Sequence, residues 1–70
     1  MLNILIIDDE KPARDRLRRL VDAMSSYRVA GEAANGAEAL DRIRELSPDI
    51  LLLDISMPGM DGMALAKVLQ

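Results

Sequence analysis

The sequence predicts an α/β fold, a doubly wound parallel sheet covered by helices, and three observations support this prediction. Two short aliphatic runs, Leu2–Ile7 and Ile50–Leu53, each stop at an acidic residue. Such runs are typical of strands that are buried on both faces of a parallel sheet. Segments with helical periodicity separate the predicted strands. The connections are too long for hairpins, which favours right-handed crossovers between parallel strands.

The first part of the chain predicts a strand, a helix and an edge strand. After Leu2–Ile7, Pro12 stands where the first turn of a helix tolerates its missing N–H. Apolar residues then recur at helical spacing and form one stripe: Ala13, Leu17, Leu20, Val21 and Met24. Ser25 and Ser26 end this predicted helix. Tyr27–Ala33 alternates between two sets of residues, a pattern that suits an edge strand better than a central one.

The middle of the chain predicts a second helix. Asn35 and Glu38 have the spacing of a capping box at its start, and Pro48 ends it. Its predicted apolar face consists of Ala39, Leu40, Ile43 and Leu46.

The last part of the chain predicts a third strand followed by a third helix. The strand is Ile50–Leu53, and Asp54 ends it. Pro and Gly in the segment Met57-Pro58-Gly59 predict a turn. Asp61 is the predicted cap of the third helix, whose apolar face would be Met63 (or Gly62), Leu65, Ala66 and Leu69.

The composition excludes several classes of protein. The 70 residues include neither cysteine nor histidine, so a disulfide and a Cys/His zinc site are both excluded. Apolar runs never approach the roughly 20 residues that cross a bilayer, and no leader-like segment begins the chain, so we expect a cytoplasmic protein without a membrane partner. The net charge of −3 argues against direct contact with nucleic acid. Four arginines interleaved with acids are interpreted as a solvated helix face: Arg14, Arg16, Arg18 and Arg19.

The acids that follow the two aliphatic strands are the candidate functional residues. Asp8 and Asp9 follow the first strand, and Asp54 follows the third. Ligands of open parallel sheets bind at the carboxyl ends of the strands, so these acids converge if the two strands are neighbours. Two like charges about 4 Å apart repel by roughly 4 kcal/mol at an effective dielectric of about 20. A hard cation such as Mg²⁺ relieves this repulsion, and the sequence therefore favours a magnesium site.

Each acid taken singly has a plainer interpretation, as a strand-end cap or a turn former. The metal site is favoured because the acids occur together after two doubly buried strands. Carboxylates also act as nucleophiles that form acyl phosphates. Asp54 is the better candidate for that role, because the adjacent Asp8 and Asp9 are better placed to hold a metal.

Three segments resemble the receiver domain of two-component response regulators. They are Leu5-Ile6-Ile7-Asp8-Asp9-Glu10, then Asn35-Gly36-Ala37-Glu38-Ala39-Leu40, and the long segment from Pro48 to Gly62. The Asp54-to-Gly62 stretch is the most specific of these, and the resemblance extends over all 70 residues.

The resemblance implies a role for each site residue. Asp9 and Asp54 would ligate Mg²⁺ directly, Asp8 would act largely through a metal-bound water, and the backbone carbonyl of Ser56 would complete the protein ligands. Asp54 would accept a phosphoryl group from the phosphohistidine of a histidine kinase. The chain would then be a phospho-acceptor signalling domain and not an enzyme.

The resemblance also implies a partial receiver domain over residues 1–70, a truncated flavodoxin-like sheet with strand order 2-1-3. The family has five strands, and the family's later Ser/Thr and Lys, which contact the phosphoryl oxygens, have no counterpart here. We therefore expect that this chain accepts a phosphoryl group less readily than a complete receiver domain. The third strand, Ile50–Leu53, would be an exposed apolar edge through which two chains self-associate.

The start of the first helix, Glu10-Lys11-Pro12-Ala13-Arg14, is similar to the branch whose full-length members carry a LytTR-type DNA-binding domain. DNA would thus be contacted only through an output domain outside these residues.

Other functions remain as alternatives. A non-catalytic interaction or dimerisation module would use the open edge of the third strand and leave the acids without a role. A haloacid-dehalogenase-type phosphatase would need an Asp-x-Asp pattern after the first strand, but Glu10 and Lys11 stand at the positions two after Asp8 and Asp9. A nucleotide-binding fold is discounted because no Gly-rich loop follows that strand.

Overall fold

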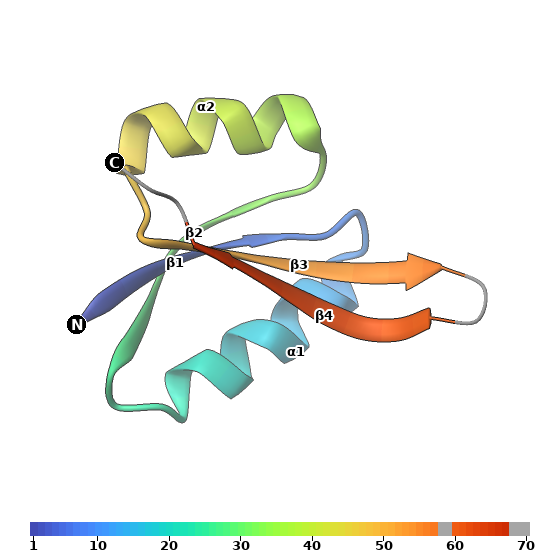
Figure 1. Cartoon of the computed structure of the whole chain (residues 1–70), viewed down its shortest axis with the longest axis horizontal. Coiled ribbons are helices and arrows are strands. Elements are labelled where there is room, and N and C mark those ends of the chain that lie inside the picture. Colours follow the sequence, from blue (N-terminus) through green and yellow to red (C-terminus); the bar gives the residue numbers. More distant parts are fainter. Residues whose placement is uncertain (58–59, 68–70) are drawn as a thin grey trace.

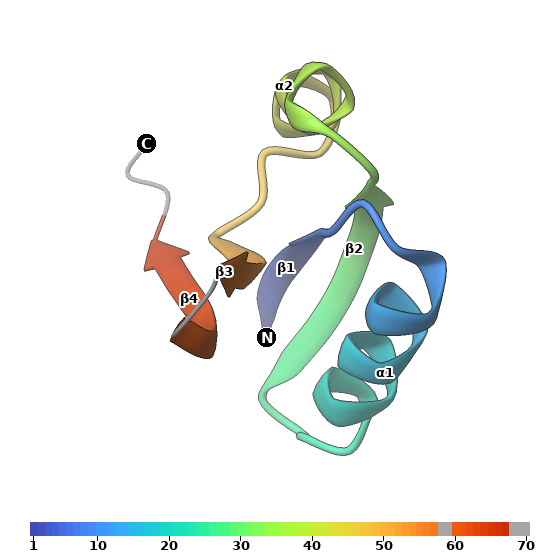
Figure 2. The same ribbon diagram turned by 90° about the vertical axis from the view of Figure 1, so that its right-hand side faces the viewer.

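The structure, a computed structural model, describes the backbone of residues 1–57 and 60–67 and the side chains of residues 1–53. Its elements follow in this order: β1 (Leu2–Ile7), α1 (Lys11–Asp22), β2 (Tyr27–Ala33), α2 (Gly36–Leu46), β3 (Ile50–Met57) and β4 (Met60–Lys67). The described strands form one sheet in the order β2-β1-β3-β4. The two helices lie on opposite faces of this sheet (Figures 1 and 2).

The first three strands confirm the predicted α/β fold and its strand order 2-1-3. β1 pairs with β2 on one side and with β3 on the other, and both pairings are parallel. β2 is an edge strand, as its alternating sequence predicts. Both helices pack against β1 and β2, so β1 is the central strand that both layers of helices cover.

The core lies between the sheet and α1. Its members are aliphatic side chains that are at most 8% exposed: Ile4, Ile6, Leu17, Val21, Ile50 and Leu52. α1 contributes Leu17 and Val21 to this cluster and also buries Ala13, which confirms one side of the predicted stripe. Leu20 and Met24 lie at the margin and are 47% and 45% exposed. α1 ends at Asp22, so Met24 lies beyond the helix.

α2 begins with the predicted cap. The Asn35 side chain accepts a hydrogen bond from the Glu38 backbone N–H at 2.9 Å, and the Glu38 carboxylate accepts one from the Ala34 N–H at 2.9 Å. The predicted apolar face is wrong in one member, because Leu40 is 56% exposed. The helix approaches β2 closely at Gly31, where an added Cβ would lie 2.7 Å from Leu46 Cδ1.

The predicted third helix is wrong, because Met60–Lys67 forms β4. This strand pairs antiparallel with β3, from Met57 opposite Met60 to Ile50 opposite Lys67. As an outer strand, β3 would present unpaired N–H and C=O groups, and β4 pairs with them. A helix of eight residues is marginal by itself, and Gly62 disfavours it further. The predicted turn residues Pro58 and Gly59, and Leu69 of the predicted helix face, lie outside the described residues.

β4 also overturns the prediction that the third strand is an open edge. β3 has a partner on both sides, β1 and β4, so self-association through the bare edge of Ile50–Leu53 does not fit this structure. The same finding removes the basis of the interaction-module alternative. β3 is longer than predicted and continues to Met57, with Asp54 inside the strand and not at its end. The β3–β4 pair extends beyond the part of the sheet that the helices cover (Figure 1).

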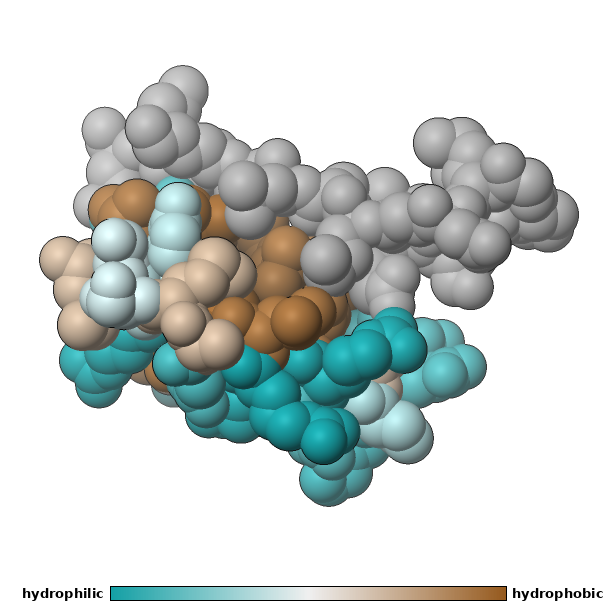
Figure 3. All heavy atoms as spheres, turned by 90° about the horizontal axis from the view of Figure 1, so that it is seen from below, coloured by the Kyte–Doolittle hydropathy of each residue, from teal (hydrophilic) through white to brown (hydrophobic). Residues whose placement is uncertain are grey.

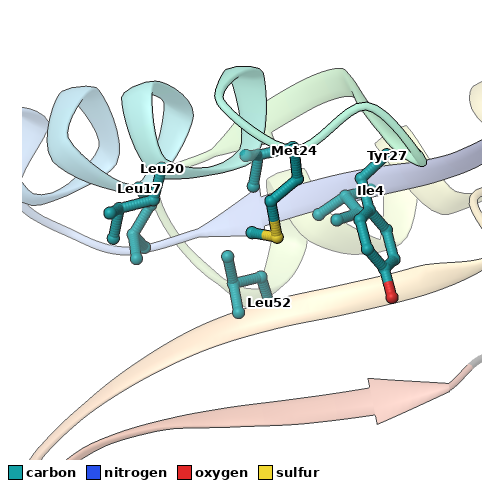
Figure 4. A pocket seen from close by; sticks show the side chains of 7 residues that line it. Ile4, Leu17, Leu20, Met24, Tyr27 and Leu52 are labelled. Atoms are coloured by element: carbon teal, nitrogen blue, oxygen red, sulfur yellow. The ribbon is translucent and has the colours of Figure 1, made fainter.

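The face of the sheet that carries α1 is incompletely covered. A groove of about 560 Å³ lies beside this helix, and its lining is apolar: Ile4, Leu17, Leu20, Val21, Met24, Tyr27 and Leu52. Figure 4 shows side chains of α1, β1 and β3 turned towards this shared space. In the space-filling view an apolar area opens on the same side of the molecule, with hydrophilic residues along its lower border (Figure 3). The helix therefore buries one side of its apolar stripe and leaves the other side at the surface.

Two leucines of α1 provide a test of this packing. Leu17 is 1% exposed and Leu20 is 47% exposed. Leu17→Ala should cost about 2–5 kcal/mol, because it leaves a cavity in the core, and should unfold so small a domain largely or completely. Leu20→Ala should cost less than about 1 kcal/mol, as is usual for a surface position. Urea unfolding followed by circular dichroism measures both, and equal losses would show that α1 does not pack as described.

Candidate functional site

The strand register brings the acidic positions to one edge of the sheet. At the carboxyl end of β1, Ile7 lies opposite Leu53 of β3 and opposite Ala33 of β2. The next residues of the two neighbouring strands are Asp8 and Asp54. Because β1 and β3 are parallel, the backbone continues in the same direction beyond Ile7 and beyond Leu53. We call this end of the sheet the carboxyl edge. The prediction that the first and third strands are neighbours is therefore confirmed.

Asp8 is fixed at the carboxyl edge by its backbone and its side chain. It is 9% exposed, which is unusual for an aspartate. Its N–H donates to the Ala33 carbonyl at 3.0 Å. Its carboxylate oxygen Oδ1 accepts a hydrogen bond from the Glu10 N–H at 2.8 Å. This carboxylate thus lies at the start of α1, where the helix dipole favours a negative charge.

The other predicted site residues differ in how fully the structure describes them. Asp9 is exposed and follows Asp8 in the connection between β1 and α1. Asp54 lies in β3 opposite Met63 of β4, and Ser56 lies opposite Asp61. The side chains of Asp54 and Ser56 lie outside the described residues, so their predicted roles as acceptor and ligand remain predictions.

The donor atoms at the carboxyl edge fit the chemistry of Mg²⁺, an ion that prefers carboxylate, carbonyl and water oxygens. Asp8 and Asp9 supply two carboxylates within the described side chains. Among residues 1–53 no three His, Cys, Asp or Glu side chains form a group that could hold a metal ion. A complete site therefore needs a further oxygen donor, and Asp54 is the acid that the register brings level with Asp8.

An ion-pair network joins α1 to the same edge of the sheet. Arg14 Nε lies 3.2 Å from Glu32 Oε1, and Arg18 donates to Glu32 Oε2 from both Nε (2.9 Å) and Nη2 (2.6 Å). Arg14 Nη1 also donates to the Asp8 carbonyl oxygen at 2.7 Å. The side chain of Arg14 is only 16% exposed.

The network corrects the interpretation of the four arginines as a solvated face. That interpretation is wrong for Arg14, whose side chain is 16% exposed, whereas the Arg18 side chain is 43% exposed and Arg16 and Arg19 are also exposed. The spacing of Arg14 and Arg18 indicated that the two side chains could share a partner, because residues four apart on a helix lie on the same face. The sequence did not reveal that Glu32, at the carboxyl end of β2, would face both of them.

Comparison with known proteins identifies the family. Residues 4–70 match the response regulator receiver domain. The chain belongs to this family. It is a receiver domain of a two-component system, which confirms the resemblance drawn from the segments around Asp9 and Asp54.

The receiver domain has curated relatives among bacterial regulators. It is 56% identical over 66 residues to the positive alginate biosynthesis regulatory protein of Pseudomonas aeruginosa, covering 93% of this chain and 27% of that protein. It is 41% identical over 69 residues to the transcriptional regulatory protein BtsR of Salmonella typhi, covering 99% of this chain and 29% of that protein. The chain therefore spans less than a third of the length of these relatives.

A solved structure supports the fold independently. The response regulator domain of Thermotoga maritima CheB superimposes with a TM-score of 0.75 at 34% identity, covering 89% of this chain and 46% of that one. Within the described residues of this receiver domain, neither helix has the length and apolar character needed to cross a membrane.

Proposed function

We propose that this receiver domain accepts a phosphoryl group on Asp54 from the phosphohistidine of a histidine kinase. The observation that carries the proposal is the register of β1 with β3. Ile7 lies opposite Leu53, so the acidic pair Asp8-Asp9 and the acceptor Asp54 come directly after the last paired residues of β1 and β3, at the carboxyl edge. Family membership supplies the kinase as the class of phosphoryl donor.

Mg²⁺ would be held by Asp9, Asp54 and the Ser56 carbonyl, with Asp8 acting largely through a metal-bound water. The surroundings of Asp8 support an indirect role, because Asp8 is 9% exposed and one of its carboxylate oxygens already accepts a hydrogen bond from the Glu10 N–H. Asp9 is exposed, so an ion can reach its carboxylate. When bound, the ion would neutralise the charge of the phosphoryl oxygens during transfer.

The chemical step needs little from the protein beyond this arrangement. A carboxylate oxygen of Asp54 attacks the phosphorus, the bond from phosphorus to the imidazole nitrogen breaks, and an acyl phosphate forms on Asp54. The electron pair of the broken bond leaves with the imidazole. Positioning and charge compensation are the main contributions that a protein makes to phosphoryl transfer.

The output of the module is inferred from its relatives. Two of them are named as regulatory proteins, and this chain corresponds to 27% and 29% of their lengths. We infer that phosphorylation acts through an output domain of the LytTR type and that only this output domain contacts DNA. The chain's net charge of −3 agrees with a module that does not bind DNA itself. A cytoplasmic location follows from the same inference.

The first test of the proposal is a magnesium titration. Mg²⁺ should bind weakly, because few protein ligands surround an ion that gives up its water reluctantly. Asp9→Ala should abolish binding and Asp8→Ala should weaken it. Asp41→Ala is the control, because Asp41 is an exposed acid on α2. Calorimetry measures all four proteins, and an unchanged titration in Asp9→Ala would exclude this site.

The second test is modification by acetyl phosphate. We expect slow and incomplete phosphorylation that needs Mg²⁺ and is confined to Asp54. It is incomplete because the Ser/Thr and Lys that the resemblance implies are not among these 70 residues, and each hydrogen bond to a charged oxygen is worth about 1.5–3 kcal/mol. Intact-mass spectrometry should find one phosphoryl group in the native chain and in Asp41→Asn, and none in Asp54→Asn. Phosphorylation that persists in Asp54→Asn would contradict the assignment of the acceptor.

A further inference from the structure

Arg14 makes a hydrogen bond to the backbone of the acidic pair. Its Nη1 donates to the carbonyl oxygen of Asp8 at 2.7 Å. We propose that Arg14 is a positioning residue that fixes the peptide unit between Asp8 and Asp9 and thereby holds Asp9 ready for Mg²⁺. This inference rests on the proposed function, because it assigns Arg14 a role at the same metal site.

The geometry of the peptide unit explains why a contact to this carbonyl matters. The Asp8 carbonyl and the Asp9 N–H belong to one rigid plane, so fixing the oxygen fixes the direction in which the chain enters Asp9. On the other side of Asp8, the N–H donates to the Ala33 carbonyl at 3.0 Å. Asp8 is therefore held at both of its peptide units, by β2 on one side and by α1 on the other. Asp9, which is exposed, gains its orientation from this fixed neighbour.

Glu32 holds the guanidinium group of Arg14 in place. Arg14 Nε lies 3.2 Å from Glu32 Oε1, so the two nitrogen atoms reach two different elements, β2 and the end of β1. A planar guanidinium group with several fixed donors suits such a bridge, whereas the single ammonium group of lysine does not. The bridge is 16% exposed at Arg14 and 26% exposed at Glu32, which shields it in part from water.

Arg18 provides a matched control on the same helix. It donates to the same carboxylate, at Glu32 Oε2, one turn further along α1. Loss of Arg18 would weaken the attachment of α1 to β2, as loss of Arg14 would, but it would leave the hydrogen bond from Arg14 to the Asp8 carbonyl in place. A difference between the two positions therefore reports on the metal ligands and not on helix packing.

The test compares Arg14→Met, Arg18→Met and Arg14→Lys in the 70-residue chain, with Mg²⁺ affinity as the first measurement. Methionine keeps an apolar stem and removes the donors, so packing is disturbed little. Arg14→Met should weaken Mg²⁺ binding roughly tenfold or more, as is typical when a group that orients a metal ligand is removed. Arg18→Met should stay within roughly twofold of the native chain, since its partner is not a metal ligand. Arg14→Lys should recover part of the loss, because its ammonium group is a donor to the carbonyl.

The second measurement is independent of the metal. Without Mg²⁺, nuclear magnetic resonance should show shifts of the Asp8 carbonyl carbon and the Asp9 amide in Arg14→Met, and these signals should stay in place in Arg18→Met. If Arg14→Met does not fold, as judged by circular dichroism, Arg14→Gln replaces it, because glutamine is too short to bridge Asp8 and Glu32. The same weakening is expected of this variant.

The outcomes separate the two proposals. A native chain that does not bind Mg²⁺ at all would overturn the proposed site and this inference with it. A native chain that binds Mg²⁺, with equal affinity in Arg14→Met (or Arg14→Gln) and Arg18→Met, would overturn the positioning role of Arg14 and leave the proposed site intact.

Discussion

Parallel pairing of β1 with β3 is the constraint on which the site depends. Ile4 and Ile6 lie opposite Ile50 and Leu52, and all four belong to the core that α1 covers. A slip of one residue would turn these side chains to the other face of the sheet, so burial specifies the register strongly. In the same register, Asp8 and Asp54 each follow a member of the last pair, Ile7 and Leu53. Packing of apolar residues therefore fixes where the backbone of Asp8 and Asp54 lies.

Positive charges of α1 lie beside the acidic residues of the carboxyl edge. Arg14 lies between the backbone of Asp8 and the carboxylate of Glu32, and Arg18 adds a second positive charge to Glu32. The start of α1 contributes as well, because Glu10 offers no side-chain cap and its N–H is instead bound by the Asp8 carboxylate. The acidic pair is thus attached to α1 and β2 as well as to β1. We attribute to this network a role in the orientation of the acidic pair.

Local patterns in the sequence were sufficient to predict most of the fold. They were insufficient where the structure of a segment depends on a partner that is distant in the sequence. The bounds of β1 and β2 and the cap at Asn35 follow from strand periodicity and capping chemistry, which depend on near neighbours. Met60–Lys67 could not be assigned in this way, because its strand structure comes from pairing with β3 and not from its own propensity. The candidate site likewise has one part that the sequence predicted and one part that it did not. The neighbouring positions of Asp8 and Asp54 in the backbone followed from strand order, whereas the contact of Arg14 with Asp8 depends on how α1 lies on the sheet.

The central claim is that Asp8, Asp9 and Asp54 form one cation site at the carboxyl edge. Paramagnetic broadening of amide signals by substoichiometric Mn²⁺, measured by nitrogen–proton correlation spectra, tests it most directly, because broadening falls steeply with distance from the ion. We expect the signals of residues 8–10 and 53–56 to broaden first, together and at the same Mn²⁺ concentration, while those around the exposed acids of α2 persist. Broadening that begins on α2, or that affects residues 8–10 without residues 53–56, would contradict a shared site.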